Sequence, residues 1–264
     1  MLAKRRQSVI LAEVRRAGSV RVGELSLRFG VSDMTIRRDL SDLARQGLVE
    51  KVHGGALLSD AVSRIEPGFE AKTEWDPEAK DEIAQAAAAL VRPGTAIALS
   101  AGTTTHALAR HLLRVQRLTV VTNSVRVADV FEEARRPGRT GPVVVLTGGV
   151  RTPSDALVGP IAALALHDLH VDQLFMGCHG IDPDAGLTTP NLAESETNRA
   201  LMECASQVVV LADHTKWGMV SLSSYAPLSA VDTLVTDEAM PAGTREAAAS
   251  TVGRLVVAAV PGRD

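Results

Sequence analysis

A carboxylate and an ammonium follow one of the most apolar segments of the chain, at a spacing that suits ligand binding. The segment QVVVLA leads directly into DHTKWG, so Asp213 comes immediately after it and Lys216 follows three residues later. If QVVVLA is a buried strand, both side chains lie near its carboxyl end, where α/β proteins bind ligands. There they can hydrogen-bond a polyol or an enediolate, or they can simply pair with each other.

The stretch SAGTTTHALA, residues 100–109, has the composition of a phosphate cradle. Gly102 lets the backbone turn closely, and Thr103 and Thr104 offer hydroxyl and N–H groups at the start of a predicted helix. Helix N-termini bind phosphate because their first N–H groups are unpaired and the helix dipole favours negative charge. The alternative is an ordinary threonine cap. Ser100, which precedes the loop, is also a candidate.

Polar or glycine-rich residues follow several further apolar segments. Gly148-Gly149 would let a ligand approach the backbone and Arg151 would add positive charge, although both features also occur in ordinary loops. Glu194 begins a predicted helix, where a carboxylate can also serve only to complement the helix dipole. These further candidates for ligand binding are Thr122, Asn123, Ser124, Gly148, Gly149, Arg151, Gly177 and Glu194.

Two adjacent arginines in VSDMTIRRDL, residues 31–40, indicate a different chemistry. On a helix, Ile36, Leu40 and Leu43 fall on one side, while Arg38 lies on the opposite side with Arg37 on its flank. Such a helix would bury its apolar side and present the arginines to a polyanion. A merely solvated charged face is the alternative.

The elements around these arginines predict an all-α winged helix-turn-helix over residues 1–57. Apolar periodicity indicates helices over residues 3–17, 22–29 and 32–46. Gly30 suits a left-handed turn residue, and Ser32 suits the N-cap of the third helix. Residues 48–58, LVEKVHGGALL, are typical of a hairpin. In such a domain the third helix enters the major groove of DNA.

The distribution of charge favours a polyanionic partner for this domain. Residues 1–57 contain 11 Lys or Arg and 6 Asp or Glu, a net charge of +5, whereas the remaining residues contain 17 and 25, a net charge of −8. Basic side chains that neutralise phosphates provide most of the affinity for DNA. The candidate DNA contacts are Arg5, Arg6, Ser32, Met34, Thr35, Arg37, Arg38, Ser41, Arg45, Lys51 and His53.

The rest of the chain predicts an α/β domain. Residues 58–76 are irregular and are interpreted as a linker, with packing of part of it on the following domain as the alternative. Residues 77–264 alternate between helices and short apolar strands. Strands of this kind, which include TAIAL, LTVVT, VVVLT, QLFMG, QVVVLA and DTLVT, form parallel sheets that helices cover on both faces. We therefore expect a Rossmann-like parallel sheet over residues 77–264.

Composition limits the remaining classes of protein. No apolar run reaches the roughly 18–20 residues that span a bilayer, and the basic start lacks the apolar core of a signal peptide. Cys178 and Cys204 form neither a disulfide framework nor a metal-binding motif. We expect a cytoplasmic protein that uses neither a metal nor another cofactor.

The segment VGELSLRFGVSDMTIRRDLSDLARQGLVEKVHGGA closely resembles the helix-turn-helix of the DeoR family, which commonly reads V-S-x-x-T-I-R-R-D-L and has a wing ending in H-G-G-A. The rest of the chain is similar to the sensor domain of that family through AGTT, TNS, MGCHGID, GLT, ADHTKWG and VTD, in this order. The resemblance covers nearly the whole chain. It implies a bacterial transcription regulator, usually a repressor, that binds double-stranded operator DNA as a homo-oligomer, either a dimer or a tetramer.

The resemblance also implies a sensor domain that is similar to sugar-phosphate isomerases of the ribose-5-phosphate type and responds to a phosphorylated sugar or a related metabolite. On this basis Gly102, Thr103 and Thr104 match the phosphate-binding loop, and Glu194 would contact sugar hydroxyls. Asp213 and Lys216 match the Asp and Lys of the ligand site of the family.

Two positions depart from the family pattern. Ser100 stands where members often have Asp, and Asn198 stands where they often have Lys. If both positions face the ligand, one carboxylate and one ammonium are lost. The effector then differs from the usual hexose or pentose phosphates, or the sensor responds weakly.

Two other functions compete with a regulator. The same acidic and basic groups suit acid–base chemistry in a sugar-phosphate isomerase or transferase with a DNA-binding appendage. We expect no enzyme, because no separate nucleophile or metal set is visible in the sequence. A purely architectural DNA-binding protein would not explain so many polar loops at strand ends.

Overall fold

The computed structural model describes residues 3–17, 19–45, 48–52, 54–58, 68–135 and 141–258. The chain falls into two compact units, one made of residues 1–66 and 74–76 and the other of residues 67–73 and 77–264. Each unit has its own hydrophobic core. In the described ranges no helix is long and apolar enough to cross a membrane.

The first unit is the winged helix-turn-helix that the sequence predicts. Its elements are α1 (Ala3–Ala17), β1 (Ser19–Arg21), α2 (Val22–Phe29), α3 (Asp33–Arg45), β2 (Val49–Val52) and β3 (Gly55–Leu58). Ile10, Leu25, Ile36 and Leu40 are at most 2% exposed in its core. Gly30 adopts a left-handed φ of 63°, which ends α2 and turns the chain toward α3.

The wing contains one strand more than the predicted hairpin. Strand β1 pairs antiparallel with β3, which also pairs with β2, so the sheet has the order β1-β3-β2. A Cβ atom on Gly55 would lie only 2.0 Å from the carbonyl oxygen of Val20, so glycine is needed where β1 and β3 approach. The strand has only three residues and therefore has no detectable period.

Part of residues 58–76 packs on the second unit. Helix α4 (Phe69–Thr73) belongs to the second unit. Phe69 is 8% exposed and lies edge-on to His106, with 5.4 Å between ring centroids, and the Arg126 guanidinium lies 5.2 Å from the centroid of the Phe69 ring. One aromatic side chain therefore holds this helix, which is too short to show a period. Residues 59–67 lie outside the described ranges.

The second unit is built on a parallel sheet of seven strands, as predicted. The spatial order is β15-β14-β12-β9-β4-β5-β6, and every neighbouring pair is parallel. The strands are β4 (Ala96–Leu99), β5 (Thr119–Thr122), β6 (Val143–Leu146), β9 (Gln173–Gly177), β12 (Val208–Leu211), β14 (Thr233–Asp237) and β15 (Leu255–Ala258). The chain moves outward from β4 in one direction and from β9 in the other. The switch point of the sheet therefore lies between β4 and β9.

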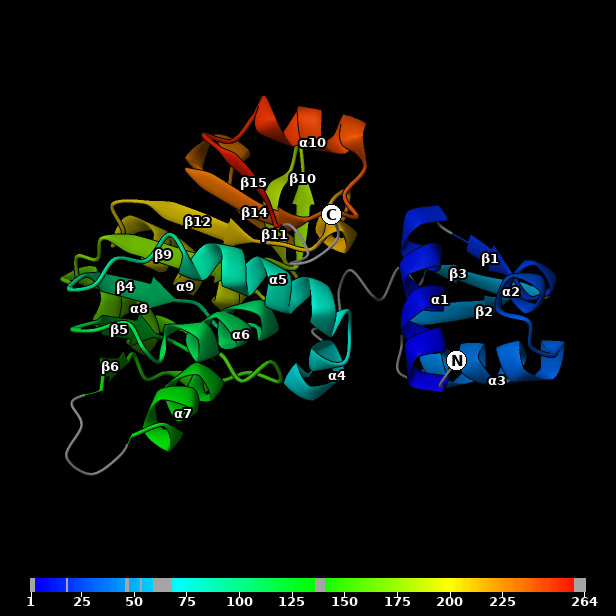
Figure 1. Cartoon of the computed structure of the whole chain (residues 1–264), viewed down its shortest axis with the longest axis horizontal. Coiled ribbons are helices and arrows are strands. Elements are labelled where there is room, and N and C mark those ends of the chain that lie inside the picture. The colour runs from blue at the N-terminus through cyan, green and yellow to red at the C-terminus, as the bar shows by residue number, and fades with distance from the viewer. Residues whose placement is uncertain are drawn as a thin grey trace. The chain divides into compact units, whose positions relative to one another are not determined.

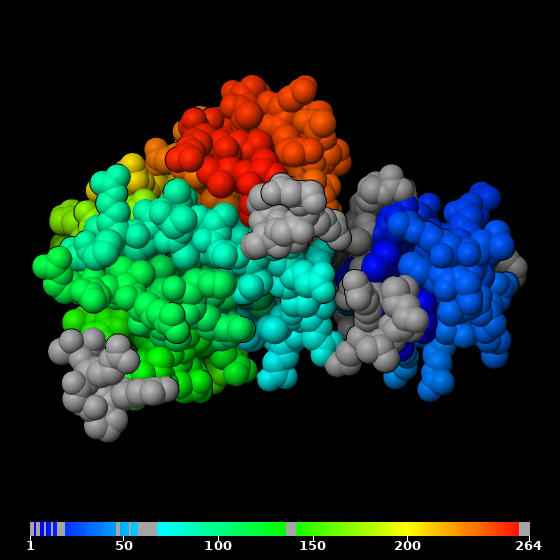
Figure 2. All heavy atoms as spheres, in the orientation of Figure 1, coloured from blue at the N-terminus to red at the C-terminus, as the bar shows by residue number. Residues whose placement is uncertain are grey.

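Helices cover both faces of this sheet (Figure 1). One face packs against α5 (Pro77–Ala88), α6 (Thr103–Leu112) and α7 (Val125–Glu133), through Ile83, Leu108 and Val127. The other packs against α8 (Pro160–His167), α9 (Leu192–Glu203) and α10 (Ala242–Ala249). In the space-filling view, the side chains of α5, α6 and α7 hide the central strands (Figure 2). The carboxyl ends of the strands remain the edge where polar loops can gather.

Small elements lie around that edge. Strands β10 (Gly180–Asp182), β11 (Gly186–Thr189) and β13 (Ser223–Ala226) form an antiparallel sheet of their own. Strands β7 (Val150–Arg151) and β8 (Leu157–Val158) form a ribbon, and η1 (His214–Lys216) is a single 3-10 turn. A second 3-10 turn, η2 (Leu228–Ala230), precedes the amino-terminal end of β14. The sequence does not predict these elements, because each is too short to show a period.

Candidate functional site

The outward face of α3 presents two arginines that have no partner in the described part of the chain. Arg37 and Arg38 are exposed, and Met34 beside them is 76% exposed. The wing lies against this face, because Lys51 Nζ on β2 donates to Ser41 Oγ at 2.8 Å and Ser41 Oγ donates to the carbonyl of Arg37 at 2.6 Å. Basic groups from the helix and the wing thus form one continuous surface.

The start of α3 is capped as the sequence predicts. Ser32 Oγ accepts from the backbone N–H of Thr35 at 3.3 Å and lies 3.0 Å from Thr35 Oγ1. Both hydroxyls remain near the surface, where the N-terminus of the helix favours a phosphate. At the other end, Arg45 is 78% exposed at its side chain and pairs with Asp42. That surface pair leaves the Arg45 guanidinium accessible to solvent.

The structure assigns Arg6 a different role from the predicted DNA contact. Its Nε donates to Asp39 Oδ2 at 2.6 Å, and the two side chains are only 8% and 4% exposed. Gln7 Nε2 donates to the other oxygen of Asp39 at 3.1 Å. Arg6 therefore ties α1 to α3 inside the unit and is unavailable to a phosphate. The side chain of Arg5 and the residue His53 lie outside the described part of the structure.

In the second unit, Ser100 and Gly177 meet at the switch point of the sheet. The backbone N–H of Ser100 donates to the carbonyl of Phe175 at 3.0 Å, and Ser100 Oγ accepts from the N–H of Gly177 at 3.2 Å. A Cβ atom on Gly177 would meet nothing within 4 Å, so there is open space beside this backbone. Ser100 is 2% exposed, and its hydrogen bonds join the carboxyl ends of β4 and β9.

The predicted phosphate-binding residues Gly102, Thr103 and Thr104 lie at the start of α6. Gly102 is the N-cap residue and offers no side chain to the first N–H groups of the helix. The hydroxyls of Thr103 and Thr104 make no hydrogen bond with described residues, whereas Thr105 Oγ1 donates to the carbonyl of Gly102 at 3.0 Å. Thr105 therefore bonds back to the N-cap carbonyl and caps no N–H group, so the first N–H groups of α6 have no side-chain cap. The Thr104 side chain is 7% exposed, and Thr103 is half-buried.

Thr122, which ends β5, and Asn123 and Ser124, which follow it, use their side chains to hold the loops together. Thr122 Oγ1 donates to the carbonyl of Leu99 at 2.7 Å, and Ser124 Oγ caps α7 by accepting from Val127 N–H at 3.2 Å. Asn123 Oδ1 accepts from Ala101 N–H at 2.9 Å, and its Nδ2 donates to Leu157 O at 3.1 Å. All three are at most 1% exposed. We correct their predicted ligand-binding role, since their polar side chains are buried and bonded to protein.

The Gly-Gly-x-Arg loop is also structural. Gly149 has φ 121°, and a Cβ atom there would lie 2.6 Å from the carbonyl oxygen of Val158. Gly148, with φ 75°, makes the turn before it. Arg151 Nη2 lies 2.7 Å from Asp155 Oδ1, and Arg126 Nε lies 2.6 Å from Asp155 Oδ2. Glycine is needed at this turn because β7 packs closely on β8. Arg151 is paired with the carboxylate of Asp155.

Replacing Gly149 with alanine is expected to destabilise the second unit by about 1–3 kcal/mol, because the new methyl group would overlap the β8 backbone and the left-handed φ would be strained. The melting temperature of this unit measures the loss. Gly243 in α10 offers the control, because a Cβ atom there meets nothing within 4 Å and its φ is not positive. Equal melting temperatures for Gly149→Ala and Gly243→Ala would contradict the packing explanation.

Asp213 is the centre of a charged cluster at the end of β12. It is 4% exposed, and its Oδ1 accepts from the backbone N–H of Thr215 at 3.0 Å and from the Thr215 hydroxyl. Burial alone would raise its pKa. The charge of Lys216, the hydrogen bonds from Thr215 and the charge of Lys80 outweigh burial and hold the pKa of Asp213 at about 2. Asp213 is therefore a carboxylate at any physiological pH.

Lys80 is a site residue that the sequence analysis missed. It lies in α5, is 6% exposed, and donates from Nζ to the carbonyl of Lys72. The sequence shows only a lysine on an Ala-rich helix. Its burial is the signal, since lysine is almost never fully buried unless its charge is compensated. The charge of its ammonium lowers the pKa of Asp213, as the charge of Lys216 does.

Three further polar residues belong to the same edge. His214 Nδ1 lies 2.7 Å from Asp237 Oδ2, and the His214 backbone N–H donates to Asp237 Oδ1 at 2.7 Å. Burial raises the pKa of the Cys178 thiol to about 12, while Lys216 lowers it and Asp213 raises it, so the thiol stays protonated. Nothing in the sequence alone links Asp237 or Cys178 to Asp213, because they follow different strands.

The first turn of α9 adds a carboxylate to this edge. Glu194 accepts a short hydrogen bond from Thr189 Oγ1 at the end of β11. Asn198 lies one turn further along the same face of α9, is 7% exposed, and makes no hydrogen bond within the described part of the chain. Glu194 is thus consistent with the predicted site, and the position that departs from the family pattern is buried beside it.

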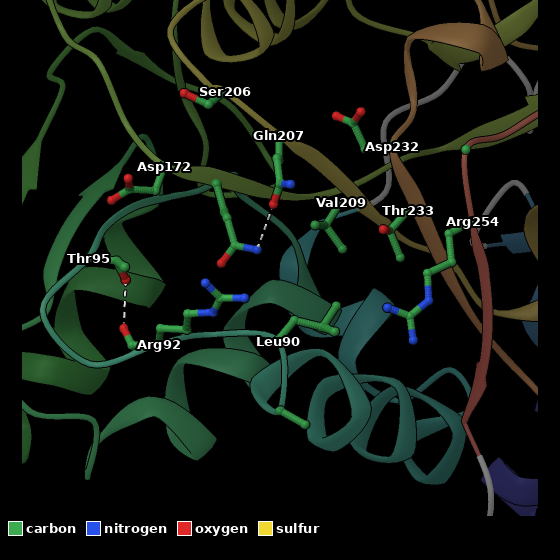
Figure 3. A pocket seen from close by; sticks show the side chains of 13 residues that line it. Leu90, Arg92, Thr95, Asp172, Ser206, Gln207, Val209, Asp232, Thr233 and Arg254 are labelled. Carbon is green, nitrogen blue, oxygen red and sulfur yellow. Dashed lines mark hydrogen bonds between the residues drawn. The ribbon is translucent and has the colours of Figure 1, made fainter.

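A cavity of about 900 Å³ lies at the opposite, amino-terminal edge of the sheet (Figure 3). Arg92 and Arg254 point into it, but Asp172 and Asp232 serve the fold, since they accept from the N–H groups of Ala96 and Val208 at 2.9 and 2.7 Å. None of the predicted ligand-binding residues lines this cavity. The predicted ligand-binding residues therefore lie away from this cavity. Among the described residues, no group of three or more His, Cys, Asp or Glu is placed to hold a metal ion.

Comparison with known proteins gives matches over both units. Residues 6–62 match the DeoR-like helix-turn-helix domain, and residues 75–238 match the DeoR C-terminal sensor domain. The chain is 36% identical to the HTH-type transcriptional regulator GlpR of Haloferax volcanii, over 93% of this chain and 94% of the relative. It is 34% identical to the transcriptional repressor AccR of Agrobacterium fabrum, over 91% of this chain and 90% of the relative.

Among solved structures, a D-ribose-5-phosphate isomerase in complex with phospho-erythronic acid overlaps with a TM-score of 0.40 and 18% sequence identity. The overlap covers 53% of this chain and 54% of that chain. A likeness of this size has no bearing on the function of this chain.

Proposed function

The chain belongs to the DeoR family of transcriptional regulators, and from this premise we propose that it represses a carbohydrate-metabolism operon until a phosphorylated sugar or related metabolite releases it from the operator. The observation that carries the proposal is the cluster of Lys80, Asp213 and Lys216 at the carboxyl edge of the sheet, where the start of α6 also opens. At that edge, the N–H groups at the start of α6 can donate to a phosphate. The Asp213 carboxylate and the lysine ammonium groups can hydrogen-bond hydroxyl groups of the ligand.

The geometry of the sheet fits a ligand of this class. Strands β4 and β12 both pair with β9, so their ends lie about 10 Å apart at the usual strand spacing. A phosphate at the start of α6 and the far end of a five- or six-carbon chain at Asp213 would bridge that distance. Glu194 is placed to accept from the hydroxyl groups between them.

The DNA-binding half of the proposal rests on α3 and the wing. We propose that Arg37, Arg38, Met34, Ser41, Arg45 and Lys51 face the DNA, with Ser32 and Thr35 at a phosphate. A base-reading arginine contributes discrimination, whereas a phosphate contact adds affinity for any sequence. The protein would bind its operator as a homo-oligomer. The exposed apolar side chains of Val143 on β6 and of Ile161 and Leu164 on α8 support that part of the proposal.

Replacing Arg38 with alanine is expected to weaken binding to the operator by about 5- to 150-fold, the equivalent of the roughly 1–3 kcal/mol that a bidentate arginine–guanine contact contributes. Binding to random DNA should fall much less. Titrations of both DNAs at one salt concentration measure the two losses, and Arg28→Ala, which changes an arginine paired with Glu13, is the control. Equal losses on operator and random DNA would exclude base reading by Arg38.

The ligand-binding half is tested by a thermal-shift screen of the full chain. The sugar-phosphate panel consists of ribose 5-phosphate, ribulose 5-phosphate, glucose 6-phosphate, fructose 6-phosphate and glycerol 3-phosphate, with inorganic phosphate as the control. A ligand at 100 times its dissociation constant stabilises the folded protein by about 2.7 kcal/mol. Release from the operator by the same compound completes the test. If no compound of the panel binds, the proposed ligand class is wrong.

A repressor needs an effector that distinguishes two states. To move the protein from 1:99 to 99:1 in favour of the DNA-free state, the effector must bind that state about 10⁴-fold more tightly. Charged groups at a buried site are suited to this, because small shifts of η1 relative to α5 would change the distances from both lysines to the phosphorylated ligand.

We propose binding without catalysis at this edge. An Asp213 carboxylate with a pKa of about 2 is a weak base, and a Cys178 thiol with a pKa of about 12 is a poor nucleophile. The relatives named above are regulators, which agrees with this view. Solvent-deuterium exchange into ribose 5-phosphate at the carbon next to the carbonyl would show isomerase-type chemistry and contradict the proposal.

A further inference from the structure

Tyr225 on β13 is buried with its hydroxyl group unsatisfied. The residue is 6% exposed, and its Oη has no hydrogen-bond partner in the part of the chain that the structure describes. Buried tyrosine hydroxyls usually find a partner, because leaving a buried polar atom unpaired is unfavourable. An orphaned hydroxyl in a native fold therefore calls for a function, and a ligand atom is one way to satisfy it.

The contacts of β13 place Tyr225 beside α9. Ser223 Oγ lies 3.0 Å from Ser195 Oγ, and Arg199 Nη2 donates to the carbonyl of Ser224 at 2.8 Å. The pairing of β13 with β11 is irregular at Tyr225, because Leu187 pairs with Ala226 and Thr188 with Ser224. Tyr225 therefore lies on a strand that contacts the first turns of α9, where Glu194 lies next to Ser195.

The neighbours of Tyr225 belong to the proposed ligand site. Burial raises the pKa of the Tyr225 hydroxyl, and the nearby Cys178 and Glu194 raise it further. Cys178 directly follows β9 at the switch point. Cys178 in turn interacts with Lys216 and Asp213. These contacts connect Tyr225 to the charged cluster by side chains that follow three different strands.

We propose that Tyr225 is a recognition residue of the effector site, where its Oη donates a hydrogen bond to an oxygen of the bound ligand. The oxygen is a hydroxyl or carbonyl group at the end of the carbon chain remote from the phosphate, because the phosphate lies at the start of α6. The inference rests on the function proposed above and extends it by naming a group that selects for an oxygen at that end of the ligand. A site that hydrogen-bonds a ligand hydroxyl discriminates strongly against an analogue that lacks it.

The first test needs no ligand and uses the full chain with Tyr225→Phe. Removal of an unpaired hydroxyl is expected to leave the melting temperature unchanged or raise it. Thr122→Val is the matched contrast, because the Thr122 hydroxyl is fully buried and bonded to Leu99 O at 2.7 Å, so its loss should lower the melting temperature. A clear fall for Tyr225→Phe would show that the hydroxyl has a structural partner and would overturn the inference.

The second test measures affinity for the sugar-phosphate panel and for inorganic phosphate by calorimetry. Tyr225→Phe is expected to bind the tightest panel member about 5- to 30-fold more weakly than the wild type, as for a hydrogen bond lost from a buried site. Its affinity for inorganic phosphate should not change, since the proposed hydrogen bond is to an oxygen at the end of the ligand remote from the phosphate. Equal affinity of both proteins for every bound panel member overturns the inference alone. If the wild type binds no panel member, the proposed function fails and the inference fails with it.

Spectroscopy can locate the contact, because Tyr225 is the only tyrosine in the chain. Ring-labelled tyrosine gives a single set of NMR signals, which should shift when the tightest panel member binds and stay in place when inorganic phosphate binds. Signals that ignore the sugar phosphate while calorimetry records its binding would place the ligand away from Tyr225 and contradict the inference.

Discussion

Asp39→Ala is expected to unfold the helix-turn-helix unit, or to leave it marginally stable. The substitution would leave the Arg6 guanidinium buried without its carboxylate, since the two side chains are 8% and 4% exposed and lie 2.6 Å apart. Breaking a buried ion pair by removing one partner costs about 3–5 kcal/mol, a large fraction of the 5–15 kcal/mol that holds a typical domain together. DNA binding should be lost at temperatures where the sensor unit stays folded, and thermal unfolding followed together with operator titration measures both effects.

Two variants separate this mechanism from a general effect of lost charge. Asp42→Ala removes a neighbouring carboxylate that pairs with Arg45, which is 78% exposed, and that accepts from Gln7 Nε2 at 3.2 Å. Gln7 keeps its hydrogen bond to Asp39 in this variant, so the loss in unfolding free energy should be smaller than for Asp39→Ala, at about 1 kcal/mol. The double variant Arg6→Met with Asp39→Leu replaces the pair by apolar side chains, and it should recover most of the stability that Asp39→Ala loses. If the double variant is no more stable than Asp39→Ala, the unpaired guanidinium is not the cause.

The same pair shows where a sequence stops being informative. The inward stripe of Ile36, Leu40 and Leu43 is confirmed, because the helical period decides which face of α3 is buried. Asp39 lies between these residues, and nothing local says that it points inward to meet an arginine 33 positions earlier. A basic residue near the N-terminus of a DNA-binding domain looks like a phosphate contact until its partner is known.

The ligand site illustrates the limitation more sharply. Sequence patterns correctly indicated polar residues beyond the parallel strands, but a side chain there has two possible tasks. Asn123 holds backbone groups of Ala101 and Leu157, which are 22 and 34 positions away, whereas the charges of two lysines lower the pKa of Asp213. Both residues follow an apolar strand, so only the three-dimensional packing separates the residue that ties two loops from the one that offers charge to a ligand.

Residues that come from helices or edge elements were missed for a related reason. Lys80 lies in the middle of an Ala-rich helix, where a single lysine normally marks the solvent face. Tyr225 lies on a strand of four residues in a small sheet that shows no period of its own. Their importance comes from burial against the carboxyl edge, and burial depends on elements distant in sequence.

Lys80→Met is expected to weaken release of the operator by the effector by about 10- to 100-fold in effector concentration. The substitution keeps most of the length of the side chain but removes the buried ammonium that acts on Asp213, and a hydrogen bond to a charged group contributes about 1.5–3 kcal/mol. Operator affinity without effector should change little, because Lys80 and the DNA-binding residues belong to different units. Release of a labelled operator, titrated with the tightest compound of the sugar-phosphate panel, measures the shift.

Lys72→Met is the matched control for this prediction. Lys72 belongs to the same unit and contributes only its backbone carbonyl to Lys80, so the substitution keeps that hydrogen bond while it removes a charge that does not act on Asp213. Lys216→Met should reproduce the effect of Lys80→Met, because the charges of both ammonium groups act on the same carboxylate. If Lys80→Met and Lys72→Met respond to the same effector concentration as the wild type, the lysine in α5 takes no part in ligand binding, and the site must be built from the strand ends and α6 alone.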